Sequence, residues 1–206
     1  MAKTARDTRP FSNCKRLTMW KMTDEENETY EETPRTFGKR LTTFSDSVAT
    51  NSAELYGDGE LVETVTTEGA GTLGIGIHYL TIDERVDLYG EELKYEDTVV
   101  STGDEIAPYQ CVACIKSKHS GMVELVKYFK AIFTKHEENV TQQESGGINY
   151  SMITLNGTYS KNMALNMKSA RAVVDSRTAE GKAFIEKWFA TAAFIGEEPD
   201  SGSGGE

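Results

Sequence analysis

Cys111 and Cys114 have the C-x-x-C spacing of metal-binding and redox-active pairs. Apolar residues recur at positions 109, 111, 113 and 115, a period of two that predicts a strand, and residues three apart in a strand point to opposite faces. One ion could not then bind both thiolates, and no second such pair completes a set of four ligands. No helix N-terminus is predicted there to activate a thiol. We therefore predict that both cysteines are small, half-buried hydrophobic residues.

The G-x-G-x-x-G pattern of dinucleotide-binding loops occurs at residues 69–74. That pattern binds phosphate only where a strand precedes it and a helix follows, and here a strand follows. We predict instead a turn and a strand face on which another group packs closely.

Other catalytic signatures are missing from the sequence. His78, His119 and His136 are scattered outside any H-E-x-x-H motif, and no serine lies in a G-x-S-x-G motif. We predict no catalytic residue, no cofactor site and no metal site, and hence a protein that is not an enzyme. An enzyme using Cys111 or a histidine stays open as a third class.

A period of two dominates the chain, which is typical of strands. Residues 122–134 carry apolar side chains on both faces, so we expect both faces of this strand to be covered. We predict a mainly β protein with strands at residues 15–22, 35–44, 60–67, 73–80, 109–116, 122–134, 150–159 and 163–174.

Two helices are expected between and after these strands. Thr81 and Glu84 form a capping box and Gly90 is a left-handed stop, which predicts a short helix with Ile82, Val86 and Tyr89 buried. Residues 178–190 predict a C-terminal helix that packs on a sheet through one apolar face formed by Phe184, Ile185, Trp188 and Phe189.

Length and charge limit the class of protein. The chain has 206 residues, which favours one domain, and a net charge of -11, which disfavours binding to nucleic acid through phosphate neutralisation. No apolar run reaches the roughly 18 residues of a membrane helix. Residues 1–10 lack the apolar core of a secretory signal, and three cysteines, an odd number, disfavour a disulfide framework. We expect synthesis in a cytoplasm.

Three regions are predicted: a basic N-terminal arm at residues 1–14, a folded domain at 15–195 and a disordered acidic Gly/Ser tail at 196–206. Residues 1–21 hold six Lys and Arg against one acid, and the loop at residues 23–34 holds six carboxylates. Each of these two segments is either a solvated surface or a contact with another copy. The candidate contact residues are Arg6, Arg9, Lys15, Arg16, Asp24, Glu25, Glu26, Glu28, Glu31 and Glu32.

The order of several short motifs resembles the major tail protein of long-tailed double-stranded DNA phages of Gram-positive hosts, of the phi-thirteen type. The resemblance covers residues 15–158 and departs from the family's T-K-G turn at residues 141–147; the C-terminal helix lies outside it. The motifs are Tyr56-Gly57-Asp58-Gly59, residues 60–63, the Gly-rich strand 73–80, the helix end Leu88-Tyr89-Gly90, Ala107-Pro108-Tyr109 and the strand 128–134.

The resemblance implies a β-sandwich with a flanking helix, or the barrel of a tail tube. It also implies hexameric rings that stack into a virion tube, through which DNA is ejected without specific binding. Its partners would be other copies and the tape measure, terminator and distal tail proteins, and residues 73–80 and 122–134 would form the inner sheet. Two alternatives remain: a monomeric β-sandwich binding module, and a connector or terminator ring of similar fold.

Overall fold

The computed structural model describes residues 8–58, 60–96, 99–101, 103, 106–137 and 152–196, and all structural statements below concern these residues. The strands are β1 Phe11–Asp24, β2 Thr29–Tyr30, β3 Arg35–Thr36, β4 Leu41–Gly57, β5 Glu60–Ile77, β6 Glu92–Lys94, β7 Val99–Ser101, β8 Gln110–Lys118, β9 Met122–Thr134, β10 Ile153–Tyr159 and β11 Ser169–Asp175. The helices are α1 Ile82–Tyr89 and α2 Ala179–Trp188.

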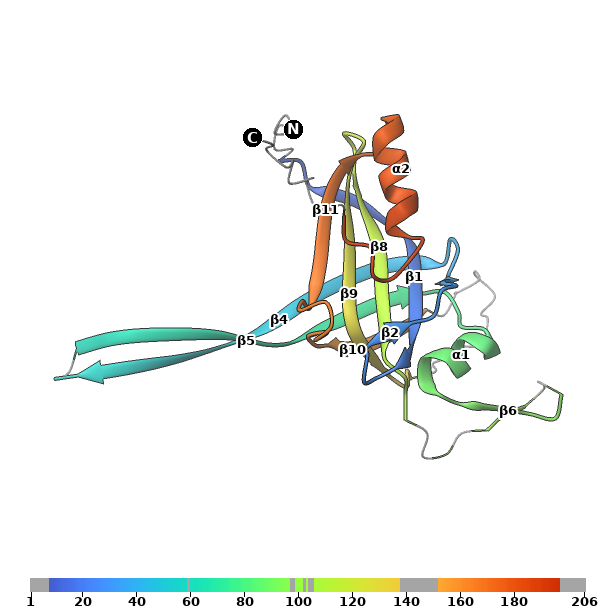
Figure 1. The fold of residues 1–206 in the computed structure, drawn as a ribbon, viewed down its shortest axis with the longest axis horizontal. Helices are drawn as coiled ribbons and strands as arrows, with labels where there is room; N and C mark the ends of the chain where they lie inside the picture. The colour runs from blue at the N-terminus through green and yellow to red at the C-terminus, as the bar shows by residue number, and fades with distance from the viewer. Residues whose placement is uncertain are drawn as a thin grey trace, which may run out of the picture.

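Nine strands form one antiparallel sheet in the order β2-β1-β8-β9-β10-β5-β4, with β11 beside β9 and β3 beside β1 (Figure 1). The sheet curls until Cys14 of β1 lies next to Thr42 of β4, with a contact of 3.7 Å from Sγ to the carbonyl oxygen. The described residues of β1 and β4 form no ladder, so the sheet does not close into a barrel. The prediction of a mainly β fold with two helices is confirmed.

Each face of the sheet has its own hydrophobic core, because β9 sends alternate apolar side chains to both faces. On the concave face Val126 and Tyr128 pack with residues of β1, β5, β8, β10 and α1. On the opposite face Leu125 and Phe129 pack with α2, including Trp188. The expectation that both faces of residues 122–134 are covered is confirmed, and α2 is the element that covers the second face (Figure 1).

Helix α1 begins and ends as the sequence predicts. Thr81 accepts from the N–H of Glu84, whose carboxylate accepts from the N–H of Thr81, and Gly90 adopts φ +70°. Its buried face is partly different, because Leu88 and Tyr89 are buried but Ile82 is exposed. Along the described residues neither helix has the length and apolar character needed to span a membrane.

The predicted strands differ from the structure in several places. Residues 60–67 and 73–80, predicted as two strands with a glycine turn between, form the single strand β5, which ends at Ile77. The single strand predicted at residues 35–44 is interrupted at Gly38, where φ is +60°, and forms β3 and the start of β4. Residues 163–168 form a turn instead of the start of β11, and β1 begins at Phe11, before the predicted 15.

Candidate assembly surfaces

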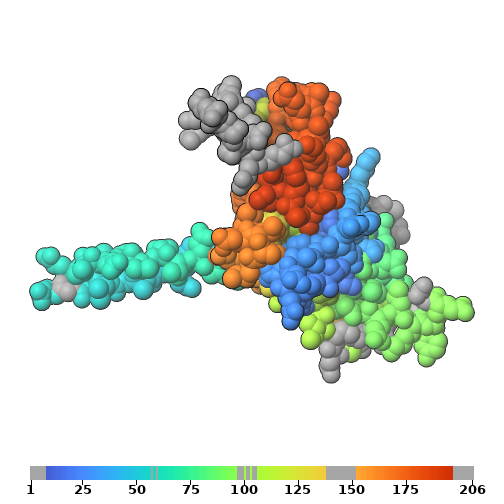
Figure 2. All heavy atoms as spheres, viewed as in Figure 1, coloured from blue at the N-terminus to red at the C-terminus, as the bar shows by residue number. Residues whose placement is uncertain are grey.

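The most prominent surface is a two-stranded ribbon that projects alone from the body of the molecule (Figures 1 and 2). It consists of residues 50–57 of β4 and 60–68 of β5, which pair only with each other, whereas β5 also pairs with β10 from Gly71 onward. We call this ribbon the extension. At roughly 3.3 Å per residue its eight pairs reach about 26 Å beyond the sheet.

Large apolar side chains lie at the far end of the extension and are exposed to solvent. Leu55, Tyr56, Leu61 and Val62 are 58%, 60%, 53% and 65% exposed. Ala53 lies directly opposite Val65 in the ladder, so the ribbon also carries an apolar pair on one face. An isolated two-stranded ribbon has no core of its own. We therefore infer that another molecule covers these side chains when the protein functions.

The base of the extension is fixed firmly to the sheet. Lys168 donates to the carbonyl oxygens of Glu68 and Gly69, at 3.1 and 2.9 Å. Tyr159 of β10 packs over Gly71 so closely that a Cβ there would lie 2.0 Å from the ring. These contacts orient the extension from a rigid point, so its tip has a defined direction in space.

Sequence reasoning did not find the extension as a single element. Residues 45–59 are mostly small and polar, because no core faces them, and they lack the apolar alternation by which buried strands are recognised. The available signal was the Gly57-Asp58-Gly59 sequence, which is typical of a hairpin turn, followed at residues 60–68 by a run rich in Thr, Val and Glu.

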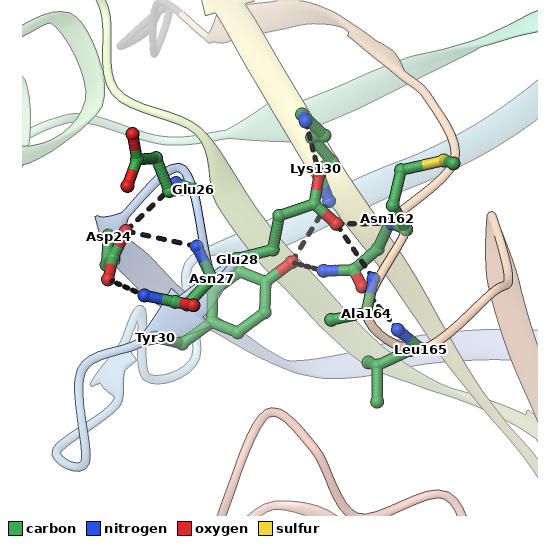
Figure 3. Close-up of polar contacts among 10 residues, drawn as sticks. Asp24, Glu26, Asn27, Glu28, Tyr30, Lys130, Asn162, Ala164 and Leu165 are labelled. Atoms are coloured by element: carbon green, nitrogen blue, oxygen red, sulfur yellow. Dashed lines mark hydrogen bonds and ion pairs between the residues drawn. The ribbon is translucent and has the colours of Figure 1, made fainter.

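The acidic loop at residues 23–34 folds back on its own subunit (Figure 3). Asp24 closes the turn by accepting from the backbone N–H groups of Glu26 and Asn27 and from the Asn27 side chain, at 2.9, 3.1 and 2.6 Å. These bonds, the Asn27 side chain first, lower the pKa of Asp24. The short strand β2 then pairs with β1 through Tyr30 and Met22.

Glu28 is the one carboxylate of this loop that is buried. It forms an ion pair with Lys130 and accepts from the backbone N–H groups of Met163 and, at 3.2 Å, Ala164. Burial alone would raise the pKa of Glu28, but these bonds outweigh it and lower the pKa. Beside it the Tyr30 hydroxyl accepts from the Asn162 amide at 3.0 Å (Figure 3).

The predicted contact residues therefore divide into two groups. Arg16, Asp24 and Glu28 have partners within the subunit; Arg16 pairs with Glu186 at 2.7 Å and lies 4.4 Å from the centre of the Phe189 ring. The exposed candidates, for which contact with another copy stays a prediction, are Arg9, Lys15, Glu25, Glu26, Glu31 and Glu32. Arg6 lies outside the described residues, as do residues 141–147 and the predicted tail from residue 197 onward.

Cys111 and Cys114 lie on opposite faces of β8, one in each hydrophobic core, and the prediction that they face apart is confirmed. Both are fully buried, and burial raises the pKa of the Cys111 thiol to about 12. In the described part of the chain no group of three or more His, Cys, Asp or Glu side chains could hold a metal ion.

The residues of the G-x-G-x-x-G pattern lie within β5 and not in a turn before a helix. The predicted close packing is present, since Tyr159 covers Gly71 and the Ser45 hydroxyl lies 2.6 Å from where a Cβ of Gly74 would be. The glycines therefore allow neighbouring side chains to pack closely against β5. The part of the prediction that placed a turn here is wrong.

No protein-family model matches the sequence, and no curated protein matches it. Among solved structures the chain is similar to a protein in the six-fold symmetrised baseplate of the anti-feeding prophage, determined by cryo-EM. The identity is 13%, the match covers 86% of this chain and 100% of that chain, and the TM-score is 0.39. A TM-score this low does not establish a shared fold.

Proposed function

We propose that this protein is a structural subunit of a phage tail or tail-like particle. Its copies assemble into hexameric rings, and the rings stack into a tube that conducts DNA. The observation that carries the proposal is the extension, because it exposes apolar side chains on a ribbon that has no function within the subunit. Phage origin and hexameric symmetry are what the resemblance of residues 15–158 to the major tail proteins implies.

Open strand edges support assembly independently of the extension. In the described part of the structure β4 pairs only with β5, and β11 pairs only with β9, so each leaves one edge of the sheet uncovered. Natural proteins seldom leave long open edges, and addition of a neighbour's strand removes them. A ring built in this way would join the sheets of adjacent copies.

The acidic charge fits a tube wall that DNA passes without binding. The net charge is -11, and screening at ordinary salt extends over roughly 8–10 Å. Within a narrow channel such a wall would repel phosphate instead of retaining it. In this role the chain has no catalytic function, and its other partners are the tape measure, terminator and distal tail proteins at the two ends of the tube.

Removing the extension tests the proposal. In the variant, residues 52–66 are replaced by Asn-Gly, a two-residue turn that joins the opposed residues Asn51 and Thr67. We expect the body to fold unchanged, with the same Trp20 and Trp188 fluorescence. We also expect the variant to lose the concentration-dependent assembly that the proposal predicts for the full chain, measured by sedimentation velocity and negative-stain microscopy.

Two point variants test whether assembly depends on the apolar side chains of the extension or on exposed apolar side chains in general. Val62→Ser should weaken assembly, whereas Ile106→Ser, at an apolar side chain 86% exposed in the body, should not. A full chain that sediments as one copy at every concentration would contradict the proposal and favour the monomeric binding module.

A further inference from the structure

The seam between β1 and β4 contains an open pocket of about 460 Å³. Residues 13–16 of β1 form one wall, and residues of the segment 36–41 form the other. β1 pairs with β8 along one edge, but over Phe11–Lys15 its second edge has no strand partner within the described residues. An unpaired edge beside a cavity can accept a further strand.

The pocket is basic. Lys15, Arg16 and Lys39 line it, and none of its lining residues is acidic. A β-bulge lies between Lys15 and Thr18, with Arg16 at φ +57°, and interrupts the regular pairing of β1 at the edge of the pocket. Arg16 pairs with Glu186, but Lys15 and Lys39 are exposed and have no ion pair with any described residue.

The wall formed by residues 36–41 is already held in place within the single subunit by hydrogen bonds of Arg40. Arg40 donates to the carbonyl oxygens of Phe37 and Tyr79, at 3.0 and 3.3 Å, and to the Glu84 carboxylate at 2.9 Å. Phe37 is itself buried in the concave core. An incoming segment would therefore meet a preformed surface, which reduces the entropy lost on binding.

The extension has the opposite charge. Residues 50–68 hold five carboxylates and no Lys or Arg, together with the exposed apolar side chains described above. The chain has a net charge of -11, so two copies repel each other overall and a local basic patch favours their contact. Lys15 and Lys39 supply such a patch, and Cys14 and Leu41 supply apolar surface within it.

A subunit cannot fill this pocket with its own extension. Strand β4 begins at the pocket with Leu41 and ends in the extension with Gly57, so the two sites lie at opposite ends of one strand (Figure 1). We propose that the seam pocket receives the extension of a second copy of this chain. This inference rests on the proposed function and names the surface through which it operates.

The contact is head-to-tail, because the two surfaces that meet are different. Such a contact leaves one extension and one pocket free after every addition, and it continues until a ring closes or a filament ends. The geometry thus provides the growth that a stacked tube requires.

Chemical coupling tests the contact in the unmodified protein. A carbodiimide joins a lysine amine to a carboxylate that touches it, and a mixture of ¹⁴N- and ¹⁵N-labelled protein separates links between copies from links within one. We expect mixed-label links from Lys15 or Lys39 to Glu54, Glu60 or Glu63. Links from these lysines only to residues 197–206 or to the loop at 23–34 would overturn the proposal.

Charge reversal provides the second test. Lys15→Glu with Lys39→Glu should weaken association about tenfold or more. Glu60→Lys with Glu63→Lys, added to the same chain, should restore it. Lys161→Glu with Lys182→Glu, at two exposed sites that do not line the pocket, changes the net charge equally and should have little effect.

The outcomes separate this inference from the proposed function. If the pocket variant assembles normally while the variant without the extension does not, the pocket is wrong and the proposed function stands. If both assemble normally, both proposals fail.

Discussion

Two buried charges hold together parts of the chain that are far apart in sequence. Glu28 connects the acidic loop to Lys130 and to the turn at residues 163–164. Lys127, fully buried, donates to the carbonyl oxygens of Trp188, Thr191, Ala192 and Phe194 at 2.8–3.2 Å. Nothing in the spacing of acidic and basic residues distinguishes these two from exposed ones, so sequence reasoning could not identify either.

Replacing Glu28 by Gln should destabilise the fold by about 1–3 kcal/mol, because Lys130 loses its partner and the amide satisfies fewer of the surrounding donors. Glu26→Gln, at an exposed position in the same loop, should leave the free energy of unfolding unchanged in urea titrations. The pKa of Glu28 is lowered in the fold, so its contribution is complete above the ordinary value of 4.5 and is lost as the pH falls below it. A Glu28→Gln chain as acid-sensitive as the wild type would contradict this role.

Because Lys127 is buried, we predict that the free energy of unfolding rises at alkaline pH. Burial lowers the pKa of Lys127 from 10.5 to about 8, so between these values the unfolded chain binds more protons and unfolding becomes less favourable as the pH rises. The full effect is up to about 3 kcal/mol. Urea unfolding below, within and above this window should show the rise in wild type and in Lys182→Met, an exposed site, but not in Lys127→Met. A flat wild-type profile would mean that the four carbonyl groups offset the desolvation of the amine.

At the scale of elements, strands with a buried face were predictable and strands without one were not. Residues 122–134 form β9 with the bounds expected, and α1 starts and stops at Thr81 and Gly90, because apolar alternation and capping side chains are local signals. The extension has no buried face and therefore no apolar alternation, although its two strands are close in sequence. The continuous course of β5 depends on contacts with Tyr159 and Ser45, which are distant in sequence. The glycines at 69–76 indicate a turn until Tyr159 and Ser45 are seen to occupy the space above them.

Gly71→Ala should destabilise the sheet by about 1–3 kcal/mol, because the added Cβ would meet the Tyr159 ring at 2.0 Å and force the ring to move. Gly69→Ala is the matched control, since its Cβ would make an ordinary contact at 3.5 Å. The midpoint of thermal unfolding should fall in the first variant only. Equal midpoints would show that Tyr159 yields easily and that the base of the extension is less rigid than described.

At the scale of the whole molecule, sequence reasoning predicted a mainly β, acidic chain but not the distribution of its surface. The candidate contact residues were chosen for charge alone, and Arg16, Asp24 and Glu28 among them have partners within the subunit. The seam pocket arises from how far the sheet curls, and the extension arises because β4 and β5 continue beyond the end of their pairing with the rest of the sheet. No local sequence pattern reports that curvature.

The assembled protein should not retain DNA. With a net charge of -11, we expect fluorescence anisotropy to detect no binding of double-stranded DNA tighter than about 10⁻⁴ M even at low salt. Binding that weakens steeply as salt is added would contradict the acidic-wall interpretation and would instead show that the basic side chains gather into a phosphate-binding surface.

The position of Lys127 also has a consequence during synthesis. Phe194 emerges 67 residues after Lys127, and at about 5–20 residues per second several seconds separate the two on the ribosome. Until then the Lys127 ammonium group lacks its carbonyl acceptors, so the nascent chain cannot complete the core between β9 and α2. A prematurely terminated product would keep that defect permanently, because the four acceptors would never be made.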